Sequence, residues 1–264
     1  YSSSVSNNSL LLEDFEINGA LQFRIVLVSG SDTSVMDTGV PSAMIRDGET
    51  HRFSLAGNAD ANEVRLFIDG NEVYAETDAA LAPLVAGGTL VIGQEQDAPG
   101  GGFDPNQVLH GEIADIRVWD TYRTEAEIRE TAFAEIEDPS GIDGLVINWR
   151  PDADNPNAIV DVLGGQELGL SHSPGFSRVD PPVPNPVEVI NTVYLNPVNP
   201  GFGAGSDLIN TDQYLGISNT ANMPTDALTL EWLFRAPVPF ETTGPDQIFL
   251  SYAVPDTDNE ILIY

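Results

Sequence analysis

The sequence predicts an all-β protein, an antiparallel β-sandwich with one short α-helix. Apolar and polar residues alternate in many short stretches, as they do along strands that have one face in the core. Turn-forming residues separate these stretches, and only one segment carries the signals of a helix. Many strands beside a single short helix indicate two packed sheets rather than alternating strands and helices.

One hairpin can be read directly from the sequence. In 63–69, Val64, Leu66 and Ile68 share one face, and Asp69-Gly70 then provides a tight turn. We therefore expect 63–69 to pair with 72–76. The other expected strands are 21–28, 89–94, 113–119, 144–150, 228–234, 248–254 and 260–264.

The expected helix begins at a capping box. Thr124 is the N-cap and Glu127 stands three residues later, so each side chain can bond the backbone of the other. This motif predicts a helix of two or three turns over 125–133.

Composition excludes several classes of function. The 264 residues carry a net charge of −31, and all ten basic residues are arginine. Such a surface repels nucleic acid and anionic membranes and attracts divalent cations, although dense carboxylates also serve solubility in a salty medium. No apolar run reaches the ~18 residues needed to cross a membrane. Cysteine is absent, which excludes disulfides, thiolate zinc sites and cysteine nucleophiles.

A proline-rich stretch over 172–188 divides the chain. It contains Asp180-Pro181-Pro182-Val183-Pro184-Asn185-Pro186, which predicts a stiff, extended linker. We expect 1–171 and 189–264 to be the two parts of the fold on either side of it. The second part offers about four strands and no evident way to close a sandwich alone.

The segment 93–107 is the strongest candidate for a functional site. Glu95 and Asp97 follow an expected strand, and the glycines at 100–102 let the loop return with Asp104 and Gln107. The main-chain oxygen of Gln96 is a further donor. Calcium binds six to eight such oxygens, so the spacing indicates a metal site; an acidic, solvated loop is the alternative.

Residues 89–120 resemble the calcium loop of the pentraxin family. The shared features are the Gln94–Asp97 run, the Gly-Gly-x-Phe step and Gly111-Glu112-Ile113 with Val118-Trp119-Asp120. The resemblance implies a jelly-roll sandwich of the pentraxin and laminin-G (concanavalin A-like) type. It implies a pair of calcium ions held by Glu95, Gln96, Asp97, Asp104 and Gln107. Asp104 departs from the family, in which we expect Glu.

The resemblance also implies an Asp-Asn ligand pair, which in this chain lies near the other end. The run 249–264 is similar to an early part of a pentraxin, so Asp258 and Asn259 are the implied ligands. Residues 1–171 resemble the later part of the family and 189–264 the earlier part. Three arrangements fit this permuted order: a window on a tandem-repeat protein, a domain closed on itself, or a subunit that donates its last strands. We favour the first or the third.

Other polar groups carry weaker signals. Asp152, Asp154, Asn157 and Asp161 lack the pattern of a calcium loop and are interpreted as an acidic turn. The isolated histidines, His51, His110 and His172, indicate no metal site. We expect Glu112 and Asp115 on opposite strand faces, where they cannot flank one glycosidic bond. The tryptophans Trp119, Trp149 and Trp232 are expected in the core.

These observations predict a non-catalytic, secreted or surface-exposed calcium-binding module. Its expected partners are copies of itself, arranged in a surface array, adhesin or filament. The alternative is calcium-dependent, lectin-like binding of sugars or phosphorylated head groups, which needs open calcium positions beside an apolar pocket. We expect no catalytic residues, no nucleic-acid partner and no insertion into a membrane.

Overall fold

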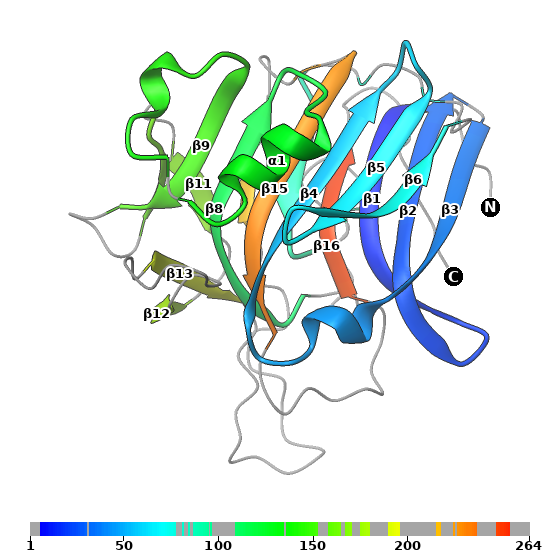
Figure 1. Cartoon of the computed structure of the whole chain (residues 1–264), viewed down its shortest axis with the longest axis horizontal. Coiled ribbons are helices and arrows are strands. Elements are labelled where there is room, and N and C mark those ends of the chain that lie inside the picture. The colour runs from blue at the N-terminus through cyan, green and yellow to red at the C-terminus, as the bar shows by residue number, and fades with distance from the viewer. Residues whose placement is uncertain are drawn as a thin grey trace.

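The computed structural model describes sixteen strands, one α-helix and two 3-10 turns. The described residues are 6–30, 32–77, 81, 84, 87–94, 96, 109–134, 136–152, 158–164, 167–170, 175–179, 190–195, 215–217, 224, 226–236 and 247–253. The strands pair antiparallel throughout and form the two sheets of a sandwich (Figure 1). The predicted fold class, an all-β jelly-roll sandwich with one short helix, is confirmed.

The first sheet contains the strand that leads into the candidate site. Its order is β3 (Asp32–Pro41), β2 (Ala20–Gly30), β1 (Ser6–Ile17), β16 (Gln247–Ala253), β7 (Thr89–Ile92), β14 (Leu215–Ile217) and β11 (Glu167–Leu170).

The second sheet faces the first across the core. Its order is β10 (Ile159–Asp161), β9 (Leu145–Pro151), β8 (Gly111–Trp119), β15 (Ala227–Arg235), β4 (Thr50–Asn58), β5 (Glu63–Ile68) and β6 (Asn71–Glu76). Strand β11 pairs with both β14 and β10 and so joins the sheets. A ribbon of β12 (Gly175–Val179) and β13 (Ile190–Leu195) attaches to the first part of β8, and β12 falls inside the predicted linker.

Most of the predicted elements are present. Strand β7 ends at Ile92, two residues before the expected end at residue 94. The expected strand 260–264 lies outside the described residues. The sequence analysis did not identify β1, β3, β4 or β10–β14. The turn at Asp69-Gly70 has positive φ at both residues, 54° and 74°, as a two-residue hairpin requires.

Helix α1 (Glu125–Thr131) lies across the outer face of the second sheet (Figure 1). Its capping box is formed as predicted, although the helix ends two residues before Phe133. Ile128 is fully buried and packs against Ala56 of β4 and Phe67 of β5. The short 3-10 turns are η1 (Ser42–Ile45) and η2 (Pro139–Gly141).

A bulge in β8 overturns one expectation from the sequence. Ile113 and Ile116 both lie in the core cluster, although strict alternation would place residues three apart on opposite faces. The pairing with β15 shifts register here, and Asp115 has a φ of 45°. Glu112 and Asp115 therefore share the outer face of the sheet, and the expectation of opposite faces was wrong.

Both parts of the sequence build one sandwich within this chain. Strand β15 lies between β8 and β4, and β16 lies between β1 and β7. Their aromatic residues meet those of the first part: Phe53 stacks on Trp232 with 5.4 Å between ring centroids, and Phe249 lies 5.7 Å from Phe23. The three tryptophans are buried, as predicted.

Candidate metal centre

The loop that carries the predicted ligands starts and ends at one point of the first sheet. Gly93 follows β7 with a φ of +89°, a conformation that glycine adopts without strain. Its N–H donates to the Phe249 carbonyl of β16 at 3.0 Å. Its own carbonyl accepts from the N–H of Leu109 at 2.9 Å. The loop between Gly93 and Leu109 is therefore closed at its base and attached to β16.

Ser251 of β16 joins that strand to the start of the loop. Its hydroxyl donates to the Gln94 carbonyl at 3.0 Å and accepts from Nε2 of Gln96 at 3.1 Å. The same Nε2 donates to the carbonyl of Thr89 at 3.0 Å. Gln96 is 3% exposed, so these bonds hold its side chain against β7 and β16.

The contact lies on the outer side of the first sheet. Leu250 and Tyr252 of β16 belong to the core cluster, so Ser251 between them faces away from the core. Ser251 was not singled out from the sequence. Its signal is a small hydroxyl residue inside an apolar strand, 249–253, opposite a strand that leads into an acidic loop.

Of the predicted ligands, only Gln96 lies within the described residues. Glu95, Asp97, Asp104, Gln107, Asp258 and Asn259 lie outside them. Within the part of the chain that the structure describes, no three His, Asp or Glu side chains gather as a metal site would require. The described residues thus include the base of the predicted ligand loop and one predicted ligand, Gln96.

A buried charged cluster lies beneath helix α1; we define it as Arg52, Asp115, Arg117, Asn148, Arg123 and Glu231. Asp115 bonds Arg52 at 2.6 Å and accepts from Nδ2 of Asn148 at 2.9 Å. Burial would raise the pKa of Asp115, but Arg117 and Arg52 hold it well below its usual range. A carboxylate held ionised between two guanidinium groups cannot act as a general acid, so this cluster stabilises the fold.

Of the two described histidines, only His51 lies on a strand, β4. The ring of His51 lies between Asp69 and Asp47, at 2.8 and 3.1 Å. Burial lowers the pKa of His51, but the hydrogen bonds to Asp69 and Asp47 outweigh it and raise the pKa. His110 precedes β8, and His172 lies outside the described residues. Neither His51 nor His110 belongs to a metal cluster among the described side chains.

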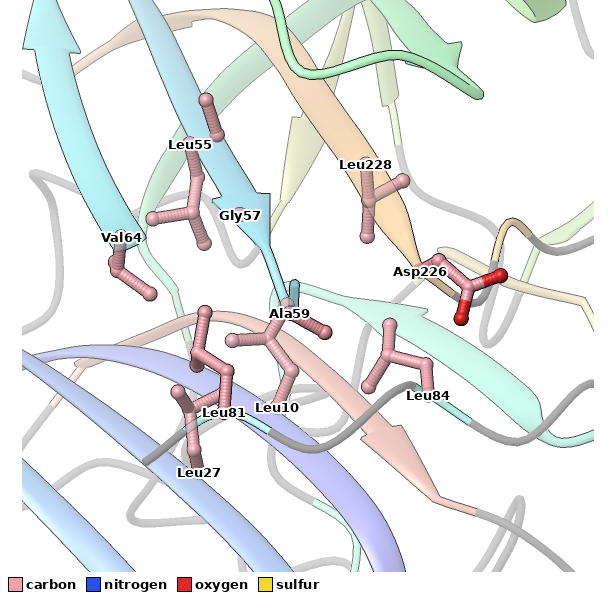
Figure 2. Close-up of a pocket in the computed structure, with 11 residues that line it drawn as sticks. Leu10, Leu27, Leu55, Gly57, Ala59, Val64, Leu81, Leu84, Asp226 and Leu228 are labelled. Atoms are coloured by element: carbon pink, nitrogen blue, oxygen red, sulfur yellow. The ribbon is translucent and has the colours of Figure 1, made fainter. Parts of the chain in front are cut away.

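An apolar pocket opens between the sheets at one end of the sandwich (Figure 2). Leu10 and Leu27 of the first sheet face Leu55, Val64 and Leu228 of the second. Leu81, Leu84 and Asp226 complete most of its lining. Because Leu10 faces the core, this pocket lies on the opposite side of the first sheet from Ser251 and Gln96. The pocket and the base of the candidate loop therefore lie on different sides of this sheet.

The region around the loop is similar in sequence to known proteins. Residues 28–154 match the sequence model of the pentaxin family. Over these residues the chain resembles pentraxins in sequence. The region is 32% identical to neuronal pentraxin-2 of Cavia porcellus and 33% identical to human neuronal pentraxin-1, over 122 and 123 residues. Each alignment covers 46% of this chain and 26% of the relative.

A larger multidomain protein is also similar to the pentraxin region. Over 144 residues the chain is 30% identical to the sushi, von Willebrand factor type A, EGF and pentraxin domain-containing protein 1 of Rattus norvegicus. The alignment covers 54% of this chain and 4% of that protein. Among the described residues, no helix is long and apolar enough to cross a membrane.

Proposed function

We propose that this chain is a non-catalytic, calcium-binding β-sandwich module of a secreted or surface-exposed protein. Its site would hold two calcium ions between the loop after β7 and an Asp-Asn pair from a strand beside β16. The loop donors would be Glu95, Asp97, Asp104, Gln107 and the main-chain oxygen of Gln96. The pair would be Asp258 and Asn259, from this chain or from a neighbouring copy.

The attachment of the loop to β16 supports this proposal most directly. Ser251 is bonded to both Gln94 and Gln96, and Asp258 and Asn259 follow it by seven and eight residues. The proposed donors from the two distant stretches would therefore start from adjacent strands. They are carboxylate and amide oxygens, which suit calcium.

Calcium would contribute charge neutralisation as well as a link between segments. The chain carries 41 acidic and 10 basic residues, so crowded carboxylates repel one another in the folded state. A divalent ion bound only by the folded state stabilises it by mass action. Calcium and folding are then coupled, which makes the melting temperature a measure of the site.

Self-association is the second part of the proposal. We propose 1–171 and 189–264 as two structural parts joined by the linker 172–188. In the assembly, the segment that follows β16 would add a strand to the sandwich of a neighbouring copy or of the next tandem unit. Strands β15 and β16 lie between strands of the first part in this same chain, so only the segment that follows β16 would be donated.

The test is a calcium titration followed by melting temperature and light scattering. At a hundredfold excess over Kd, calcium adds about 2.7 kcal/mol. For a chain of this size, that corresponds to a rise of roughly 5–10 °C in Tm. The variant Asp97→Asn should lose most of this rise. Asp60→Asn, a matched change at an exposed carboxylate of a turn, should keep it.

The outcomes separate the proposals. An unchanged Tm on adding calcium and on chelation would exclude the structural calcium site. If calcium raises Tm but the particle stays monomeric at all concentrations, self-association is excluded and the calcium site is retained. Calcium-dependent binding of phosphocholine or a sugar by the monomer would favour the lectin-like alternative.

A further inference from the structure

One position on the core face of the second sheet has no side chain. The core-facing residues of β4 stand in cross-strand rows, each with one neighbour from β5 and one from β15. Two successive rows are filled by large buried residues: Ile68, Phe53 and Trp232, then Leu66, Leu55 and Leu230. The next row consists of Val64, Gly57 and Leu228, so the central strand contributes only a hydrogen atom there.

The glycine at this position leaves open space. A methyl group on the Cα of Gly57 would meet no atom of the described residues within 4 Å. The φ of Gly57 is not positive, so the backbone conformation does not require glycine. Glycine inside a strand weakens it and often marks a place where a ligand or another backbone approaches closely. We therefore attribute Gly57 to the space that it leaves.

This space belongs to the apolar pocket between the sheets (Figure 2). Leu10 and Leu27, which pair across β1 and β2, line the pocket from the first sheet, and Gly57 lines it from the second. Its volume is about 50 Å³. An apolar cavity stays dry, and one of about 150 Å³ binds benzene. A space one third as large suits the end of an alkyl chain rather than a ring.

The pocket opens to solvent beside an acidic group. Leu27, Leu81 and Leu84 of its lining are half-buried, and Asp226, the only charged residue among the described residues that line it, is exposed. The N–H of Ala59 donates to the main-chain carbonyl of Asp226 at 2.8 Å, which fixes this rim to the turn after β4. The Asp226 carboxylate and the net charge of −31 repel an anionic head group and attract a cationic one.

We propose that this pocket binds the alkyl end of a small cationic amphiphile, a primary alkylammonium ion. Its hydrocarbon chain lies between the sheets in the space at Gly57, and its ammonium group lies beside Asp226. Because the pocket is on the core side of the first sheet, binding does not depend on the candidate metal loop. A ligand held between the two sheets by the folded state alone also stabilises the sandwich.

The experiment uses three probes with one hydrocarbon chain and different charge: n-pentylammonium, 1-pentanol and pentanoate. Binding to the whole chain, in chelator, is followed by Tm and by NMR shifts of the leucine methyl groups. Millimolar n-pentylammonium should raise Tm and shift the methyl signals of Leu55 and Leu228 with saturation. It should bind more tightly than 1-pentanol, and 1-pentanol more tightly than pentanoate, by roughly threefold at each step, as one exposed charge contributes.

Filling the pocket tests the site in a way that loss of folding cannot imitate. Gly57→Leu should abolish binding while keeping or raising Tm, because the new side chain occupies the open space. Gly57→Ala, the smaller change, should weaken binding. The matched control is Gly141→Leu in η2, at an exposed glycine whose Cβ position is equally open among the described residues; it should bind as the wild type does. Asp226→Asn should remove the preference for the ammonium ion over the alcohol.

Several results would overturn the proposal. One is the absence of saturable methyl shifts in the wild type, and another is unchanged binding by Gly57→Leu. Tighter binding of pentanoate than of n-pentylammonium would overturn the cationic ligand. Methyl shifts that follow protein concentration instead of the amine would assign the pocket to a side chain of a second copy, which also contradicts the proposal.

Discussion

At the scale of single residues, the buried charged cluster is the most consequential feature of the described structure. Arg52 donates to the Asp115 carboxylate and also to the main-chain oxygens of Asp115 and Ala132. Arg117 bonds Asp115 and the carbonyls of Thr131 and Ala134. Removing one charge from such a cluster leaves buried charges without compensation.

Asp115→Asn should therefore destabilise the protein by about 3–5 kcal/mol at pH 7. Arg117 and Arg52 lower the pKa of Asp115 in the folded state against the effect of burial, whereas in the unfolded chain the pKa is about 4. The contribution is present above the unfolded pKa and is lost as pH falls through that value toward the folded one. Denaturant unfolding between pH 7 and pH 3 measures this.

The pH dependence of the free energy of unfolding tests whether the ionised carboxylate of Asp115 causes this loss of stability. The wild type should lose more stability than Asp115→Asn over this range, because the variant has no carboxylate to protonate there. Asp60→Asn, at an exposed position, should keep the wild-type slope. Equal slopes for the wild type and Asp115→Asn would contradict the assigned ionisation.

At the scale of elements, helix α1 is stabilised at both ends by side chains. Thr124 and Glu127 form the capping box at its start. Arg52 and Arg117 bond carbonyls at its end. A seven-residue helix is too short to be stable alone, so these caps and the packing of Ile128 maintain it.

Thr124→Ala should lower the free energy of unfolding by about 1 kcal/mol, because the alanine cannot accept the N–H of Glu127. Thr124→Ser keeps the hydroxyl and should cost much less. Chemical denaturation of the two variants measures the difference. Equal losses would attribute the effect to the threonine methyl group rather than to the cap.

At the scale of the whole molecule, aromatic packing joins the two parts of the sequence. Phe249 of β16 contacts the rings of Phe23, Phe53 and Phe234, with centroids 5.3–5.7 Å apart. Phe53 also stacks on Trp232 of β15. The second part of the chain is thus integrated into the core that the first part begins.

Phe249→Ala should destabilise the whole sandwich by about 3–5 kcal/mol, since it removes a fully buried ring shared by both sheets. Unfolding should remain one cooperative transition, because the parts 1–171 and 189–264 share this core. Denaturant curves followed by tryptophan fluorescence and by circular dichroism test both statements. Separate transitions in the two signals would mean that the parts unfold independently.

Local chemistry made much of the fold predictable. The hairpin at Asp69-Gly70 and the capping box at Thr124 depend on neighbours in the sequence, and both are present. Alternation identified strands such as β2, β5 and β15. It did not identify β1, whose polar start, Ser6–Ser9, lacks an apolar face, and it did not foresee the bulge at Asp115.

The candidate site likewise has a part that the sequence predicted and a part that only the structure showed. The acidic, glycine-rich loop after β7 is evident from the sequence, because its ligand types and their spacing are local properties. The sequence alone determined the strand pattern, the capped helix, the acidic charge and the resemblance of the loop to the pentraxin family. Only the tertiary structure decided that β16 lies between β1 and β7 and that Ser251 bonds Gln94 and Gln96. Pairing between strands far apart in sequence depends on the packing of the whole core, which no local pattern encodes.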